Sequence, residues 1–144
     1  MQNSITPIFI LLVSASISLS LTLDSRSNAA DWQYVGSTSD FLVYVDKQSI
    51  EVENNLRKYW VWTALNEKEI DPISGQPYTQ TMLNWEGDCT NDILKIHEVI
   101  YYSTNGNVVS RMALNPPIIV KRVPNTFGDI ILKYVCNSKK HSGR

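Results

Sequence analysis

The pair of cysteines, Cys89 and Cys136, constrains the fold of this chain more than any other feature. They are the only cysteines in the sequence, so an intramolecular disulfide has a single possible pairing. It closes a loop of about 47 residues, for which the chain-entropy estimate is roughly 4 kcal/mol of stabilisation. The two residues form neither a C-x-x-C redox motif nor part of a metal-ligand cluster. We therefore interpret them as a structural disulfide.

The first 30 residues differ in kind from the rest. Residues 5–23 are apolar and uncharged, with interspersed serines, and residues 24–30 are small and polar. This pattern is typical of a secretory signal peptide, with cleavage expected after Ala29 or Ala30. An uncleaved membrane anchor is the alternative, which the serines disfavour. Export agrees with the disulfide, because disulfides persist outside the cytosol.

The remaining residues predict one folded domain, over 31–136, followed by a polar, disordered tail over 137–144. The net charge of -1 and the hydrophobic content of 43% describe an ordinary globular chain. Basic and acidic residues nearly cancel, which excludes the basic stripe of a nucleic-acid-binding protein.

Short runs of aromatic and β-branched residues, separated by turn residues, predict a series of strands. The strands are expected at 32–35, 41–46, 56–65, 78–85, 92–103 and 108–114, with a loop at 66–77. Asn105 and Gly106 favour a type I′ hairpin turn, and Pro116 and Pro117 are expected to end the last strand. In the strand at 92–103, we expect the core face to carry Leu94, Ile96, Ile100 and Tyr102.

A C-terminal helix is indicated by apolar residues at helical spacing. Phe127, Ile130, Ile131, Tyr134 and Val135 form one stripe, and Cys136 follows it directly. Thr126 is the expected N-cap, with Asp129 reaching back to its backbone N–H. The predicted fold is therefore α+β: a single antiparallel β-sheet of five or six strands, with the helix packed on it and stapled by the disulfide.

The residues offer no recognisable catalytic site. His97 is the one histidine in the predicted domain, and we interpret it as structural rather than as a base. Asp88 is expected to accept backbone hydrogen bonds at a turn, because a neighbouring carboxylate would make the Cys89 thiol less reactive. We expect no enzyme activity, no cofactor and no metal site.

Aromatic residues are the stronger functional candidates, because Tyr and Trp are enriched at protein interfaces. We predict a protein-docking patch on the sheet face away from the helix, formed by Tyr59, Val61, Val99 and Tyr101. The alternative is that these side chains only cover one another. The tail with Lys139, Lys140, His141 and Arg144 could contact anionic surfaces, but we favour the interpretation that it is a solvated tail.

The pattern of aromatic, turn and cysteine positions resembles the surface-adhesin E-like family of bacterial exported proteins. The residues that carry the resemblance are Trp32, Val35, Tyr44, Val45, Asp46, Trp60, Trp62, Asp88, Cys89, Pro124, Thr126, Val135 and Cys136. The resemblance implies an antiparallel sheet flanked by a disulfide-held helix. It also implies binding of host matrix and plasma proteins at the cell surface, with a tendency to dimerise.

The function expected from the sequence is that of an exported, non-catalytic, adhesin-like domain that binds a host or envelope protein. A periplasmic accessory or inhibitor protein is the main alternative, and an unrecognised enzyme is the third. The expected location is the periplasm, the cell surface or the medium. The partner is expected to be a protein, with a homodimer as one option, and neither nucleic acid nor a membrane span after cleavage is expected.

Overall fold

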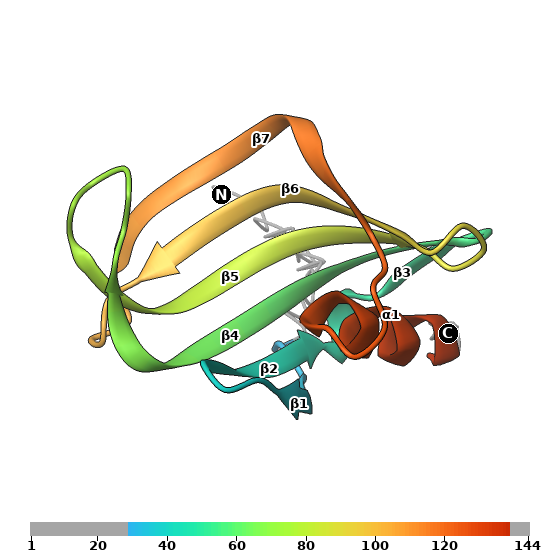
Figure 1. Cartoon of the computed structure of the whole chain (residues 1–144), viewed down its shortest axis with the longest axis horizontal. Coiled ribbons are helices and arrows are strands. Elements are labelled where there is room, and N and C mark those ends of the chain that lie inside the picture. The colour runs from blue at the N-terminus through green and yellow to red at the C-terminus, as the bar shows by residue number, and fades with distance from the viewer. Residues whose placement is uncertain (1–28, 139–144) are drawn as a thin grey trace, which may run out of the picture.

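A computed structural model of the chain describes residues 29–138. The predicted signal peptide up to Asn28, and the predicted tail beyond Ser138, lie outside these described residues. Within them, one antiparallel sheet forms a single curved layer, and helix α1 packs against one of its faces (Figure 1). No helix between residues 29 and 138 is long and apolar enough to cross a membrane.

The sheet contains seven strands, and six of them follow the order β1-β2-β4-β5-β6-β7. The seventh, β3, pairs with the first residues of β4, and β2 pairs with residues further along β4. The elements are β1 (Trp32–Ser37), β2 (Phe41–Asp46), the 3-10 turn η1 (Lys47–Ser49), β3 (Glu51–Glu53), β4 (Leu56–Ile70), β5 (Pro77–Asp88), β6 (Ile93–Tyr102), β7 (Val108–Lys121) and α1 (Phe127–Asn137). The predicted antiparallel sheet, C-terminal helix and single disulfide are confirmed, but the count of five or six strands is wrong.

The strand that the sequence did not predict is β3, which has three residues. Its sequence, Glu-Val-Glu, is too short and too polar to show the alternation of a half-buried strand. It pairs with the start of β4 because the chain reverses at Asn54, whose φ of 53° lies in the left-handed region that turns require.

Two strands run further than the sequence suggested. Strand β4 continues to Ile70, so the loop before β5 is confined to residues 71–76. Strand β7 continues through Pro116 and Pro117 because it is an edge strand, where a missing N–H costs no ladder hydrogen bond. The prolines also lie in a stretch where the pairing with β6 is interrupted, between Ala113 and Ile118.

The hairpin between β6 and β7 is not the predicted type I′ turn. A type I′ turn needs positive φ at both central residues. Gly106 has a φ of 78°, but the φ of Asn105 is not positive. The N–H of Ser103 donates to the carbonyl of Asn107, closing a three-residue loop. A turn followed by a left-handed glycine is the usual form of such a loop.

The hydrophobic core lies between the sheet and α1. Its fully buried members come from β2, β4, β5, β6 and the helix, and they are Val43, Val45, Tyr59, Val61, Trp85, Leu94, Ile131, Leu132 and Val135. The helix enters this core through Phe127, whose ring meets the rings of Phe41 at 5.1 Å and Trp85 at 5.4 Å, both edge to face. The predicted apolar stripe of the helix therefore faces the sheet.

The helix lies very close to the sheet at Gly87. A Cβ atom at this position would lie 2.7 Å from Cδ1 of Leu132, which is closer than real contacts allow. Glycine thus permits the helix to approach β5 directly.

The start of α1 is held by charged side chains around the buried carboxylate of Asp129. Its oxygens accept hydrogen bonds from Arg122 Nε at 2.6 Å, from Lys133 Nζ at 2.8 Å and from the N–H of Asn125 at 3.0 Å. Asp129 therefore reaches back one residue further than predicted. Thr126 is the N-cap residue, as predicted, but its hydroxyl donates to the carbonyl of Val123 and makes no capping hydrogen bond. The side-chain hydrogen bond from Lys133 and the backbone hydrogen bond from Asn125 lower the pKa of Asp129 to about 2.

The far end of α1 is held by the disulfide between Cys89 and Cys136, whose Cα atoms lie 5.7 Å apart. The predicted pairing is confirmed. Cys89 stands in the turn between β5 and β6, so the bridge joins the C-terminal end of the helix to one end of the sheet.

Candidate protein-docking face

The sheet face opposite α1 carries a set of aromatic side chains. In β2 and β4 the core residues alternate with residues that point the other way, because successive side chains of a strand lie on opposite faces. Tyr44 follows Val43, and Trp60 and Trp62 flank Val61, which is fully buried on the helix side. The pairing of Tyr44 with Trp62 then places both rings on the same outer face.

Four of these rings form a continuous row across β1, β2 and β4, which we call the aromatic row: Tyr34, Tyr44, Trp62 and Trp32. Tyr34 meets Tyr44 edge to face, with ring centroids 5.6 Å apart, and Tyr44 stacks on Trp62 at 5.0 Å. Trp32 meets Trp62 at 5.9 Å, with the ring planes inclined by 63°. Such contacts fix ring orientation in advance of any binding event.

The aromatic row is open to solvent along one side. Tyr34 is 57% exposed and its neighbour Leu42, on the same face, is 37% exposed. Trp32, Tyr44 and Trp62 are partly buried by one another. Apolar side chains that are both exposed and contiguous are a feature of protein interaction surfaces.

A cleft of about 360 Å³ opens beside the row. It is lined by Trp32, Trp62, Gln80, Met82, Tyr102 and Gly106. Two indoles, a phenol and a thioether thus face one space, and none of these six residues, all within 29–138, is charged. The volume is within the range of small-ligand pockets.

The four residues of the predicted docking patch lie on the sheet face that carries α1, not on the opposite face. Tyr59 is 1% exposed and Val61 is 0% exposed, and both belong to the core beneath α1. Val99 and Tyr101 pair with Leu83 and Thr81 of β5, which puts them on the same, helix-bearing face of the sheet. The four residues do share a face, but the prediction that this face points away from the helix is wrong.

Two physical reasons explain the error. Both faces of β4 are bulky, so alternation alone did not say which face the helix covers. In β6 the pairing with β5 shifts between Ile96 and Glu98. The extra residue, His97, moves Val99 and Tyr101 to the face of Leu94 and Ile96, and it moves Ile100 and Tyr102, which were predicted to face the core, to the outer face. Ile100 is nevertheless buried there, at 3% exposure, whereas Tyr102 is only partly buried.

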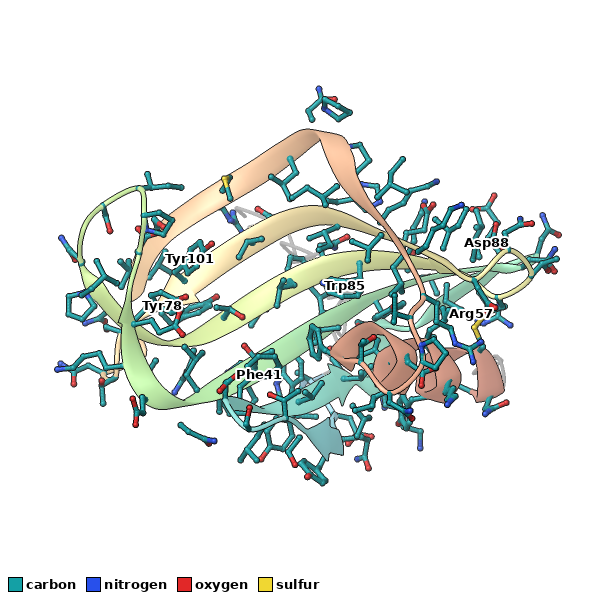
Figure 2. The ribbon with its side chains drawn as sticks, viewed as in Figure 1. Phe41, Arg57, Tyr78, Trp85, Asp88 and Tyr101 are labelled. Carbon is teal, nitrogen blue, oxygen red and sulfur yellow. A yellow bond between two sulfur atoms is a disulfide. The ribbon has the colours of Figure 1, made fainter. Side chains whose placement is uncertain are left out.

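Tyr101 is part of a small polar cluster at the end of the sheet near the loop at 71–76. Figure 2 shows its ring beside Tyr78, at the end of the sheet away from Asp88, and the two centroids are 4.8 Å apart. The Tyr78 hydroxyl donates to Glu69 at 2.9 Å. Burial and this hydrogen bond raise the pKa of Tyr78 to about 12. Burial also raises the pKa of Tyr101, so both phenols are protonated at neutral pH.

Glu86 of β5 lies beside two side chains of β6. Lys95 donates to Glu86 at 2.8 Å, and Nε2 of His97 lies 3.9 Å from the other oxygen of Glu86. The hydrogen bond to Glu86 raises the pKa of Lys95, which keeps the ammonium charged. Among residues 29–138, no three His, Cys, Asp or Glu side chains gather as a metal ion would require.

Asp88 has the structural role that was predicted for it. Its carboxylate accepts the backbone N–H groups of Thr90 and Asn91, and it also accepts the side-chain amide of Asn91. The side-chain hydrogen bond from Asn91 is the largest cause of a lowered pKa for Asp88. This turn positions Cys89 for the bridge to the helix.

The aromatic row was not predicted, although the sequence contains its signal. Trp32 and Tyr34 alternate on β1, and Trp60 and Trp62 alternate on β4. Strands of this kind with two bulky faces indicate that one face is the core and the other is available for contacts. The contribution of Met82 and Tyr102 to the cleft depends on strand order and on the shift at His97, which the sequence does not reveal.

Comparisons with known proteins agree with this architecture. The model of the family described as surface-adhesin protein E matches residues 32–137. A crystal form II structure of Haemophilus influenzae protein E is similar at a TM-score of 0.51 and 14% identity, covering 75% of this chain and 95% of that chain.

Two further structures of protein E from Haemophilus influenzae align less closely. The selenomethionine form has a TM-score of 0.49 and 14% identity, over 75% of this chain and 92% of that chain. The other has a TM-score of 0.49 and 15% identity, over 74% and 91%. No curated protein matches the chain. With the family model spanning the sheet, the disulfide and α1, the chain belongs to the surface-adhesin protein E family.

Proposed function

We propose that the chain is an exported, non-catalytic domain of adhesin type that binds a protein of the host or of the bacterial envelope. The observation that carries this proposal is the aromatic row, an ordered and partly exposed set of rings on the sheet face that no element of the described chain covers. Membership of an adhesin family supports a binding role rather than a catalytic one.

The chemistry of the row suits a protein partner. Tyr and Trp provide a large apolar area with a polar atom at the rim, and few rotatable bonds are immobilised on binding. The stacking of Tyr44 on Trp62 lowers the entropic cost further because these rings are already ordered. A homodimer would use the same type of surface, and we keep it as an alternative partner.

The signal-peptide pattern of residues 1–30 and the disulfide support the proposal that the chain is exported. We propose that the mature domain acts at the cell surface, with the periplasm as the alternative. Protease treatment of intact cells separates the two locations. Degradation of the protein in intact cells is expected for a surface protein, whereas protection until the outer barrier is opened would contradict surface exposure.

Binding is tested by passing the full chain over immobilised extracellular-matrix proteins and, in parallel, over envelope extract. The diagnostic variant is Tyr34→Ala, and its control is Ile73→Ala, because Tyr34 and Ile73 are exposed to 57% and 58% but lie on different surfaces. Loss of a contact tyrosine is expected to weaken binding by about 5- to 30-fold. Equal affinities of the two variants would refute the assignment of the row as the docking face.

A further inference from the structure

The cleft beside the aromatic row offers a second kind of binding site, for a small molecule rather than a protein. Trp32 of β1, Trp62 of β4 and Tyr102 of β6 enclose it from three strands, with Met82 and Gln80 of β5 between them. The last lining residue is Gly106, where nothing lies within 4 Å of a would-be Cβ, so the cleft stays open at this hairpin.

The two indoles of the cleft are held in place by their neighbours. Trp62 stacks on Tyr44 and is met by Trp32, whose plane is inclined by 63° to that of Trp62. Two rings at such an angle line the cleft as adjoining walls rather than as one flat platform. A ligand group therefore meets aromatic surface from more than one direction without any rearrangement of the protein.

The electrostatics of this lining favour a cation. The face of an aromatic ring carries the negative part of its quadrupole, and indole attracts cations more strongly than phenol or benzene rings do. None of the six lining residues has a positively charged side chain, which would repel a bound cation or occupy its place against the rings.

The type of cation follows from the scarcity of hydrogen-bond acceptors. A primary ammonium or a guanidinium carries three to five N–H donors, and the lining side chains named above offer acceptors only at the Gln80 amide and the Tyr102 hydroxyl, so some donors would lack a protein partner. A quaternary ammonium group has no N–H donor, and aromatic cages are a known way to bind it. A hydroxyl elsewhere on such a ligand could pair with the side-chain amide of Gln80 or with the Tyr102 hydroxyl, which are the polar groups among these lining side chains besides the indole N–H groups.

We propose that this cleft binds a small quaternary ammonium compound of the choline type, with the trimethylammonium group between Trp32, Trp62 and Tyr102. Trp32 and Trp62 belong both to the aromatic row and to the cleft, whereas Tyr34 belongs to the row alone, so a change at Tyr34 separates this proposal from the protein-docking proposal.

Isothermal titration of the full chain with choline chloride tests the proposal, with sodium chloride of equal ionic strength as the blank. The matched control ligand is 3,3-dimethylbutan-1-ol, which has the same shape but carries carbon in place of the charged nitrogen. Choline is expected to bind at least about 10-fold more tightly than this neutral analogue, because several rings contribute to cation attraction. Equal binding of the two, or no binding of choline, would overturn the proposal.

Variants from different strands locate the site. Trp32→Ala is expected to weaken choline binding by about 3- to 30-fold, and Tyr102→Leu, from β6, provides a second test if the first variant does not fold. Tyr34→Ala is the control and should bind choline as the unmodified chain does. Unchanged affinity in folded Trp32→Ala and Tyr102→Leu would place the ligand elsewhere and refute the assignment.

Two other probes complete the experiment. Methyl β-glucopyranoside, a neutral sugar that can also stack on indole, should bind more weakly than choline, and the reverse order would refute the cation assignment. Phosphatidylcholine vesicles should compete no better than free choline at equal headgroup concentration. Capture of vesicles without binding of free choline would contradict a small-molecule site.

Discussion

Removal of the disulfide gives the sharpest test of how this domain is held together. In the double variant Cys89→Ser, Cys136→Ser, the unfolded chain regains the freedom of a loop spanning a sequence separation of 47 residues. The chain-entropy relation then predicts a loss of about 4 kcal/mol in the free energy of unfolding. The double variant is preferable to either single one because it leaves no free thiol.

The variant should nevertheless stay folded. Ile131, Leu132 and Val135 are 0 to 2% exposed and keep α1 in the core without the bridge. Asp129 still fixes the other end of the helix through Arg122 and Lys133. A domain of typical stability, about 5 to 15 kcal/mol, therefore tolerates the loss.

The assay is equilibrium unfolding in urea, followed by circular dichroism and tryptophan fluorescence. The midpoint should fall, and the unmodified chain under reducing conditions should behave like the double variant. A loss of less than about 1 kcal/mol would refute the loop-entropy argument. An unfolded double variant would show instead that the core under α1 is too weak to hold the helix.

Three further changes probe the core, the helix start and the aromatic row. Gly87→Ala places a Cβ 2.7 Å from Cδ1 of Leu132 and should lower the free energy of unfolding by about 1 to 3 kcal/mol; an unchanged urea midpoint would show that Leu132 moves aside freely. Asp129→Asn should remove part of the pH dependence of the free energy of unfolding. The pKa of Asp129 is about 2 in the folded chain and lies below the ordinary 3.8, so the unfolded chain binds more protons in this range. The stabilisation by Asp129 is therefore present above the ordinary pKa of 3.8 and is lost as the pH falls towards 2. Urea midpoints of the unmodified chain and of Asp129→Asn should therefore converge over this range, and a constant difference would contradict the ion-pair role. Tyr34→Ala should change stability by less than about 0.5 kcal/mol, because Tyr34 is 57% exposed; a larger loss would assign Tyr34 a packing role instead of a binding one.

Local sequence patterns were sufficient to predict most elements of this fold. Alternation in residues 41–46 marked β2, and helical spacing from Phe127 to Val135 marked the buried stripe of α1. The cysteine pairing followed from there being only two cysteines. Each of these signals depends on neighbouring residues or on composition, which is why they could be read without the structure.

Features that depend on pairing between strands were not predictable in the same way. The shift in register at His97 reverses the faces of Val99 and Ile100, and nothing in the local sequence marks it. Strand β7 can continue through Pro116 because it lies at the edge of the sheet. Because the local sequence does not mark the shift at His97, Val99 and Tyr101 of the predicted docking patch were assigned to the wrong face.

The candidate site shows the same division. The sequence identified aromatic residues as the functional candidates, and the aromatic row supports that choice of residue type. It did not identify which aromatics are covered, because Tyr59 and Trp60 are adjacent and only the position of α1 separates a core ring from an outer one.

The central claim, that this domain meets its protein partner with the sheet face opposite α1, is tested most directly by hydroxyl-radical footprinting of the full chain with and without that partner. Tyr34, Tyr44 and Leu42 should become less reactive in the complex, while Val123, which is 55% exposed and lies outside that face, should not change. Protection of Val123 with unchanged Tyr34 and Tyr44 would contradict the account.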